Sequence, residues 1–421
     1  MRSSSAERLA FTEKDYLITF RGLGGAAMVD GEELVSEAVE QTPDIDNSTG
    51  EREPEVEYIN FDDIEAKYRR DRDLETEQRK CRKLIFRRGG KEIMDLTGYN
   101  TTHPILDKQY DSDSGKPYFV LRARMEERTD QKNSKVVAFR SNSAFSTEWD
   151  QVEDEEEELP VIIGQDPSVA ELGDELFLSV IEVESVPDDS QAGSHLKWWP
   201  RFFKGPDIRH LVPFGRGPDW MKNVTPVKMP TLKIITFTRP QRPGNEALGG
   251  LGQIGEVTTD TIEEIVDPTN PDILQKAEHI NTRFKPGEEW GGIKYGKPLM
   301  NNCIGVIGHI SRFDKESPLY NEDVDEKPKI YATFAGIYDP RTRKINNIEI
   351  VAMYDEFVGV VPKNEYLEKI VYTTGMTEPD EDGKVMIIQG VGDAETWSKV
   401  IDDPFAGLRL PAAEQSLIVA T

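Results

Sequence analysis

The sequence predicts an all-β fold, a five-bladed β-propeller with an N-terminal extension that contains a short helix. First, hairpin patterns recur along most of the chain, and their second strands begin near Tyr118, Glu175, Leu232, Cys303 and Lys384. Second, a turn signal precedes each of these strands. Third, degenerate strand-rich units with a spacing of roughly 50 residues or more are typical of propeller blades. The alternative is a β-sandwich built from ordinary hairpins.

The first part of the chain differs from the rest. Residues 1–85 are predicted to form the extension, which is partly disordered, and residues 86–421 the propeller. Residues 31–57 are acidic and polar with few aromatic residues, as in disordered segments. The stretch that follows is a charged helix with Asp62 or Asp63 as its candidate N-cap. We expect this helix to be solvated and to pack beside the first blade.

The first two units place polar residues on neighbouring strands. "KEIMDLTGYNTTHPIL" is the predicted first channel strand with Asn100, and "YFVLRARME" carries Arg124 behind it. "GQDPSVAELGDELFLSVIEVE" has a Gly-Asp turn between two apolar runs, which is a hairpin signal. This hairpin offers two carboxylates, Asp166 and Glu182, at neighbouring strand ends.

The remaining three units repeat this arrangement. Their first strands carry Lys222 with Asn223, then Trp290, then Thr374, and their second strands carry Arg239, His309 and Asp393. Because the innermost strand of each blade lines the channel of a propeller, we expect these side chains to converge. The tail after Phe405 is expected to help close the ring.

Composition restricts the class of partner. The formal net charge is −27, which argues against nucleic acid and anionic membranes and is compatible with a neutral sugar. No apolar run approaches the ~18 residues of a membrane-spanning helix, and the first residues lack the apolar core of a signal peptide. With only Cys81 and Cys303, neither a disulfide framework nor a thiolate metal site is expected. A cytoplasmic location fits best, and the oligomeric state is left open.

From Lys91 to Phe405 the sequence resembles an uncharacterised propeller domain family related to the mannoside phosphorylases among the glycoside hydrolases. The resemblance is carried by "RMEERTDQKNSKV", "GQDPSV", "PDWMKNVTPV" with "TFTRPQ", "WGG" with "GVIGHIS", and "GVGDAE". It implies a five-bladed propeller with a sugar site. It also implies that Asp166 occupies the position of the proton donor and Asp393 that of a sugar-binding carboxylate.

The resemblance further assigns a set of phosphate- or substrate-binding positions, namely Asn100, Arg124, Lys222, Arg239 and His309. Several positions depart from the phosphorylase pattern. Ser168 replaces an arginine, Asn223 stands where the phosphorylases have Asp, and Thr129 replaces an Asp. The last channel strand reads "VYTTG" in place of Phe-Pro-Cys-Gly. These departures weaken the case for phosphorolysis more than the case for sugar binding.

Cleavage of a glycoside needs an acid at the leaving oxygen and a base-activated water, a carboxylate nucleophile or phosphate. Asp166 is the candidate acid, and Glu182 or Asp393 the candidate base. The arginines and lysine of the implied set either bind an anion or neutralise buried carboxylates. Trp198 and Trp199 either stack on a sugar or wedge neighbouring blades.

Two hypotheses follow. The first is an enzyme that cleaves a glycoside, such as a mannoside, by hydrolysis or phosphorolysis in the central cavity. The second is a catalytically silent propeller that binds a sugar or a protein. Neither metal nor cofactor is predicted, and inorganic phosphate is the only co-substrate considered.

Overall fold

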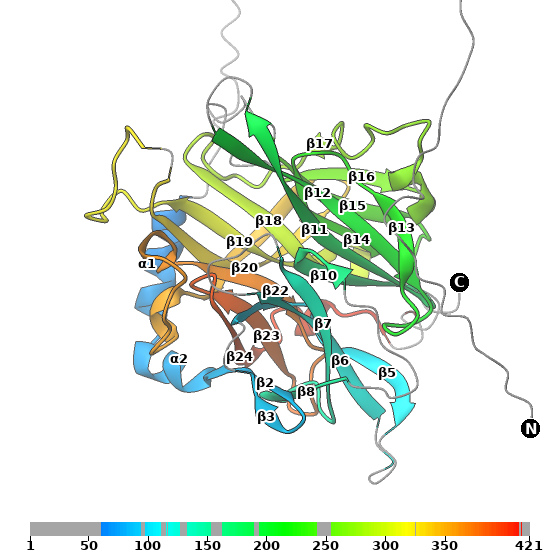
Figure 1. Cartoon of the computed structure of the whole chain (residues 1–421), viewed down its shortest axis with the longest axis horizontal. Coiled ribbons are helices and arrows are strands. Elements are labelled where there is room, and N and C mark those ends of the chain that lie inside the picture. Colours follow the sequence, from blue (N-terminus) through cyan, green and yellow to red (C-terminus); the bar gives the residue numbers. More distant parts are fainter. Residues whose placement is uncertain are drawn as a thin grey trace, which may run out of the picture. The chain divides into compact units, whose positions relative to one another are not determined.

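The computed structural model describes residues 60–93, 97–110, 115, 117–126, 133–152, 162–188, 193–241, 254–324, 326–411 and 414, all within one compact unit, Val56–Thr421. This part of the chain is mostly strand, with two longer helices, α1 (Phe61–Asp71) and α2 (Leu74–Lys80), and short 3-10 turns (Figure 1). None of its helices is long and apolar enough to span a membrane. The predicted disorder of residues 31–57 lies outside the described residues.

Four of the sheets have four antiparallel strands each. They are β10 (Gln165–Leu172), β11 (Glu175–Asp188), β12 (Gly193–Gly205) and β13 (Val212–Arg216); β14 (Met221–Lys228), β15 (Ile234–Pro240), β16 (Gly255–Thr259) and β17 (Glu278–His279); β18 (Glu289–Pro298), β19 (Ile304–Phe313), β20 (Lys329–Asp339) and β21 (Lys344–Ala352); and β22 (Val371–Met376), β23 (Lys384–Val391), β24 (Glu395–Asp402) and β1 (Cys81–Lys83). Apart from β1, successive strands pair in chain order, which is the meander of a propeller blade.

The first predicted unit has a different form. It belongs to a sheet of eight strands. They are β2 (Ile85–Arg88), β3 (Lys91–Glu92), β4 (Thr97–Thr101), β5 (Ile105–Tyr110), β6 (Pro117–Glu126), β7 (Lys135–Ser141), β8 (Glu148–Gln151) and β9 (Ile162–Ile163). The prediction of five equivalent blades is therefore wrong in its count, because only four sheets have the regular form. Pro104, which lacks a backbone N–H, lies between β4 and β5, and both of these strands pair with β6.

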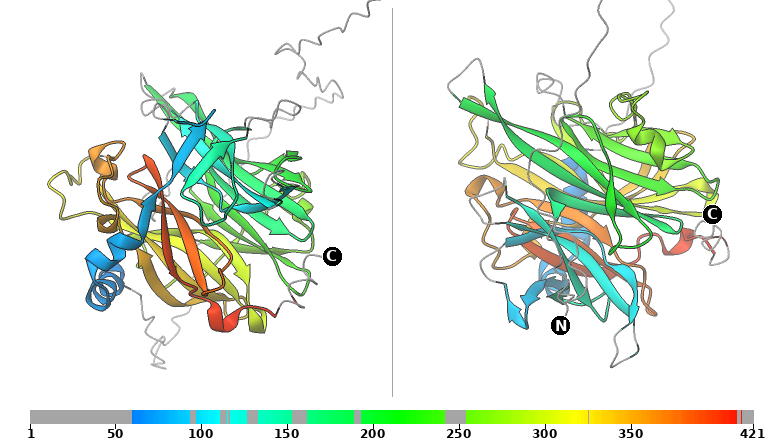
Figure 2. Two further views of the ribbon diagram at one scale, coloured as in Figure 1. Left: turned by 90° about the horizontal axis from the view of Figure 1, so that it is seen from below. Right: turned by 45° about the vertical axis from the view of Figure 1, so that its right-hand side comes forward.

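The innermost strands β4, β10, β14, β18 and β22 contact one another in that order, and β22 also contacts β4. The described unit thus has a propeller arrangement, with the all-β class as predicted. In Figure 2 the sheets follow this order through the colours from cyan to red. Polar residues at the starts of these inner strands consequently meet.

Several predicted turns have the backbone that their residues favour. Gly115, Gly173 and Gly383 have φ values of 65°, 83° and 72°, in the region that suits glycine. Asn301 and Asn302 both have positive φ, at 60° and 56°, as in a two-residue hairpin turn. These local signals are why β11 and β23 begin at Glu175 and Lys384, as predicted.

The last sheet is completed by the N-terminal side of the chain. β1 pairs antiparallel with β24, with Cys81 opposite Lys399. A strand from the N-terminal side thus completes the last sheet. Sheet pairing starts at Cys81, a few residues before residue 86, where the propeller was predicted to start. Among the described residues of the tail after Phe405, Arg409 forms an isolated bridge with Leu299 and an ion pair with Glu378.

The helices dock on the last two sheets, β18–β21 and β22–β24 with β1, and not beside the first blade as expected (Figure 2, left). The N-cap of α1 is Asn60, whose side chain accepts from the Asp62 N–H, because the helix begins earlier than predicted. Below the helices, the buried Lys399 Nζ lies 2.6 Å from both Glu77 and Glu356. The charged helical stretch is therefore held by a buried ion cluster in addition to its apolar face.

Candidate functional site

Asp166 lies at the start of β10, where a β-bulge separates Gln165 from Ser168. Its φ of 48° is uncommon for a residue with a side chain and is costly to maintain. The next residue, Pro167, has no backbone N–H, so the bulge leaves no N–H of this residue without a hydrogen bond. This local geometry presents the carboxylate to neighbouring sheets.

Groups from neighbouring sheets converge on this carboxylate. Asn100 Nδ2 donates to Asp166 Oδ1 at 2.7 Å, and an Arg124 NH1 proton is donated to the same oxygen at 3.0 Å. Lys222 Nζ lies 3.6 Å from Oδ2. Lys294 Nζ, which is fully buried on β18, donates to the Asp166 main-chain oxygen at 3.1 Å. The Asp166 carboxylate thus contacts cations from β6 and β14, and its main-chain oxygen binds a third cation from β18.

The cations determine the charge of Asp166. Burial alone would raise the pKa of its carboxyl, but Lys222, Arg124, Lys294 and the Asn100 hydrogen bond together hold the pKa well below its usual range. Burial lowers the pKa of Lys294 to about 8, although the Asp166 charge opposes this shift. Asp166 is therefore firmly ionised at neutral pH in the unliganded protein.

Asp393 is linked to Asp166 through a chain of charged side chains. Arg124 also contacts Glu126, with Nε 2.8 Å from Oε2. Glu126 Oε1 accepts from Lys363 Nζ at 2.7 Å, and Lys363 lies 3.9 Å from Asp393 Oδ2. Burial raises the pKa of Asp393, while Arg124 and Lys363 oppose the rise. The two linked carboxyls thus have pKa values shifted in opposite directions.

A second group of polar side chains lies around His309. Arg239 NH1 lies 3.3 Å from His309 Nε2, and the imidazole stacks on Tyr331 with a 1° angle between the rings. Tyr372 contacts the imidazole and donates its hydroxyl to Asn223 Oδ1 at 2.9 Å. Burial and the nearby Arg239 keep the pKa of His309 well below its ordinary value, so the ring is neutral.

Two donors of this second group are buried and have no hydrogen-bond partner within the described part of the chain. They are Arg239 Nε and Asn223 Nδ2, and the His309 Nδ1 atom of the same group is likewise without a partner. A buried donor without a partner is costly, so such groups call for an explanation in a native protein. A Cβ on Gly292 would come within 2.0 Å of Asn223 Nδ2, so glycine is required for this close approach. The lack of a side chain at Gly292 thus leaves space for the Asn223 amide nitrogen, which makes no hydrogen bond with the described residues.

Aromatic rings adjoin the carboxylate on one side. Lys222 Nζ lies 5.6 Å from the centre of the Trp198 ring. Trp198 in turn packs edge-on against Trp220, with centroids 4.6 Å apart and planes at 80°. Both indoles are half-buried, and Trp220 has a φ of 60°, which is rare for a bulky residue. We refer to Trp198 and Trp220 as the tryptophan wall.

The structure brings together most of the side chains that the sequence singled out. Asn100, Arg124 and Lys222 contact Asp166 directly, whereas Asn223, Arg239 and His309 form the adjoining group. Trp290 supports that group by donating to the Tyr331 hydroxyl at 3.2 Å. Thr374 lies on an inner strand, and its hydroxyl donates to the Ile388 carbonyl at 3.0 Å.

Glu182 is not part of this set of contacts. Its Oε2 accepts from Trp199 Nε1 at 2.7 Å, and it lines a different cavity beside Gly164. Side chains alternate along a strand, and it is the preceding residue, Ile181, that pairs with Gln165 next to Asp166. The two carboxylates thus lie at neighbouring strand ends of one hairpin, as predicted, but they contact different partners.

Other site residues were missed from the sequence. Lys294 belongs to "GGIKYGKP", which reads as an ordinary strand, and Lys363 lies in a loop with no motif. Tyr372 is the second residue of the "VYTTG" strand, which departs from the phosphorylase pattern. Glu126 follows Arg124 by two residues in a strand, and this spacing is the one signal that pointed to a same-face partner.

Residues 81–407 match the family described as "Protein of unknown function (DUF1861)". No protein of curated function matches the sequence. Among solved structures, the mannose phosphorylase MPT-4 of Leishmania mexicana, in complex with phosphate ion, has a TM-score of 0.64 and 22% identity over 82% of this chain and 94% of its own.

Two further structures have the same fold. The GDP-Man-dependent mannosyltransferase MPT-1 of Leishmania mexicana has a TM-score of 0.64 and 21% identity, covering 83% of this chain and 96% of its own. A hypothetical protein from Leishmania major has a TM-score of 0.60 and 21% identity, covering 82% and 96%. At these identities the likeness shows a shared fold.

Proposed function

We propose, from the premise that this chain belongs to the DUF1861 family of unknown function, that it is a carbohydrate-active enzyme that cleaves a glycoside with an anionic co-substrate at Asp166. The observation that carries this proposal is the convergence of Arg124, Lys222 and Lys294 on Asp166. The resemblance to mannoside phosphorylases makes a mannoside and inorganic phosphate the first pair to test.

The two linked carboxyls support glycosidic chemistry. Enzymes of this class use a pair of carboxyl groups, and environments that push their pKa values apart assign different roles to the two. Asp166 is held ionised and Asp393 is pushed toward the protonated form. Both have positive φ, at 48° and 49°, Asp166 at a β-bulge and Asp393 after the last residue of β23. Before any ligand binds, Asp166 is thus the ionised carboxyl of the pair, so its role as the acid requires a ligand that raises its pKa.

The cations support an anionic co-substrate. A phosphate held by Lys222 and Arg239 would also use Arg239 Nε and Asn223 Nδ2, the two buried donors without partners. Its charge would offset the cations that now stabilise the Asp166 carboxylate, so the pKa of Asp166 would rise. Binding of the anion would thereby prepare Asp166 to donate a proton to the leaving oxygen, the role that the resemblance assigns to it.

The tryptophan wall supports a sugar as the other ligand. Sugar rings have apolar C–H faces, and binding sites for small molecules combine such aromatic surface with few polar groups. Trp198 reaches this surface beside Lys222, so a sugar stacked there would lie next to Asp166. We place the sugar in the central cavity that the inner strands surround.

A catalytically silent, sugar-binding propeller is the second candidate. It is favoured by the complete pairing of Asp166 with cations and by Ser168, whose hydroxyl donates to the Lys294 carbonyl at 3.4 Å. At this position the phosphorylases have an arginine that binds phosphate. In this case the cations only neutralise a buried carboxylate.

The deciding experiment is a screen of manno-oligosaccharides and aryl glycosides with and without phosphate, in which released sugar and sugar phosphate are measured. Phosphate-dependent turnover is expected, and Asp166→Asn should lower it by roughly two to four orders of magnitude, because the amide cannot donate a proton. A GDP-mannose arm tests transfer. If wild-type protein and Asp166→Asn bind a glycan equally in calorimetry and neither turns it over, the protein is a catalytically silent, sugar-binding propeller and not an enzyme.

A further inference from the structure

A second cavity lies at the other end of the inner strands. Its volume is about 190 Å³. It is lined by the last residues of β10, β14 and β18, such as Glu171, Val227 and Tyr295, together with His103. Asp166 and Lys222 lie at the first residues of β10 and β14. Buried Ser168 and Lys294 lie between the two ends along β10 and β18. The cavity is thus distinct from the proposed catalytic site.

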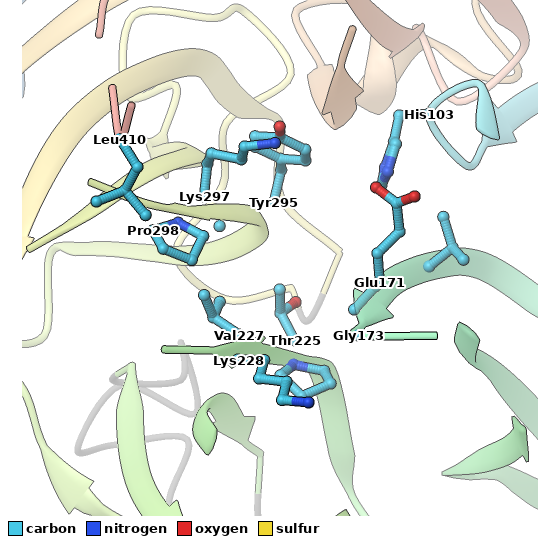
Figure 3. Close-up of a pocket in the computed structure, with 14 residues that line it drawn as sticks. His103, Glu171, Gly173, Thr225, Val227, Lys228, Tyr295, Lys297, Pro298 and Leu410 are labelled. Atoms are coloured by element: carbon cyan, nitrogen blue, oxygen red, sulfur yellow. The ribbon is translucent and has the colours of Figure 1, made fainter. Parts of the chain in front are cut away.

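Two polar groups in this cavity have no partner among the described residues. His103 is 7% exposed and its Nδ1 makes no hydrogen bond. The Glu171 carboxylate is accessible in the cavity and makes neither a hydrogen bond nor an ion pair within the described part of the chain. Figure 3 shows that the His103 ring and the Glu171 carboxylate point toward one another on one wall. A ligand that satisfies both would remove the cost of leaving a buried nitrogen unpaired.

The cavity is lined by charges of both signs, Glu171 against Lys228 and Lys297, which disfavours a strongly charged ligand. Lys297 forms an ion pair with Glu378 outside the cavity lining, so its charge is already offset. Burial lowers the pKa of His103 to about 4, so the ring is neutral at neutral pH. The Glu171 carboxyl, whose pKa burial raises, is left as the acceptor for donated hydrogen bonds. Hydroxyl groups can donate to Glu171 and also accept from Lys297 without adding charge.

The rest of the cavity is apolar and small. Tyr295, Val169, Pro226, Val227 and Pro298 supply apolar surface. Pockets for drug-sized ligands have volumes of roughly 300–1,000 Å³, so this cavity takes a single small ring at most. An apolar wall opposite a carboxylate suits a ring that has hydroxyls on its edge and C–H groups on its face.

We propose that this cavity is a second ligand site, which binds a neutral polyhydroxylated ring of monosaccharide size through Glu171 and His103. The ring packs on Tyr295 and the prolines, and adjacent hydroxyls donate to the two Glu171 oxygens. The site is separate from Asp166, so its occupancy does not depend on whether the protein is an enzyme.

The test is calorimetry on the full chain with D-glucose, D-mannose and D-galactose, with D-glucosamine and D-glucuronate as charged counterparts. We expect saturable binding of at least one neutral sugar, and at least a tenfold loss of affinity in Glu171→Gln. Glu184→Gln, which changes an exposed carboxylate on β11 of the same sheet, is the matched control and should bind as wild type does. Hydrogen exchange should show ligand protection over residues 225–228 and 295–298.

Glu171 is exposed to the cavity, so Glu171→Gln is not expected to unfold the protein, and its melting temperature verifies this. Binding that survives Glu171→Gln, or protection confined to the start of β10, would place the sugar elsewhere and overturn the proposal. Tighter binding of glucosamine or glucuronate than of every neutral sugar would overturn the ligand class. Absence of saturable binding by all neutral sugars would also refute it. None of these results bears on turnover at Asp166.

Discussion

The Arg124 guanidinium lies 3.0 Å from the Asp166 carboxylate, and its Nε lies 2.8 Å from Glu126 on the other side. Arg124 is 3% exposed, so one buried cation is shared between two acids. Removing one partner of a buried charge set leaves the others uncompensated. The effect of acid and of substitution on the stability of the protein therefore tests whether Asp166 is held as an anion by these cations.

The two linked aspartates should affect stability with opposite dependence on pH. The pKa of Asp166 is lower in the folded protein than in the unfolded chain. Its charge therefore stabilises the folded state above the unfolded pKa of ~3.9, and this stabilisation is lost as the pH falls through the pKa of the folded state. Asp166→Asn should thus be destabilised at pH 7 and approach wild type in strong acid. The measurement is urea unfolding from pH 7 downward.

Asp393 is the matched comparison. Its pKa is raised on folding, so its ionisation costs stability above the folded pKa, and Asp393→Asn should be the more stable variant at pH 7. This advantage should disappear in acid. Asparagine tolerates the positive φ at both positions, so backbone strain should not contribute to the difference in stability between the two variants. Equal pH profiles for the two variants would contradict the opposite shifts.

Arg239→Ala should weaken binding of phosphate with little effect on a phosphate-independent reaction. The substitution removes a charge-assisted hydrogen bond, which contributes about 1.5–3 kcal/mol, or roughly one to two orders of magnitude in KM for phosphate. Arg341→Ala, which removes an exposed arginine, is the control. An unchanged KM for phosphate in Arg239→Ala would exclude this arginine from the anion site.

Trp198→Ala should weaken sugar binding more than Trp199→Ala. Successive side chains of β12 point to opposite faces, and only Trp198 contacts Lys222 beside Asp166. Stacking on an exposed aromatic face is typically worth about 0.5–1.5 kcal/mol beyond burial, so several-fold weaker binding is expected. Calorimetry with the glycan found in the screen provides the measurement. Equal losses in both variants would argue that the indoles only wedge neighbouring sheets.

Lys399→Met should destabilise the protein by about 3–5 kcal/mol, because it leaves Glu77 and Glu356 as buried acids without their shared cation. Lys384→Met on the neighbouring strand removes an exposed pair with Asp402 and should cost at most about 1 kcal/mol. Denaturant unfolding compares the two. Similar losses would show that the cluster beneath α1 and α2 does not hold the helices.

Some of the fold was predictable because its causes are local. Alternating apolar residues and turn residues located β11 and β23, and the positive φ of Asn301 and Asn302 follows from the residue type. Pro104 is an equally local signal, because it separates β4 from β5 in the first unit. The membership of the family was also predictable, because short motifs keep their order along the chain.

The sequence by itself determined the strand class, the turns and most of the polar residues that meet at the inner strands. Only the tertiary structure decided that Asp393, and not Glu182, is linked to Asp166, that Lys294 and Lys363 join the site, and that Cys81 pairs with the last sheet. The physical reason is that these contacts join strands far apart in sequence. Their formation depends on how whole sheets pack, which no local pattern of residues records.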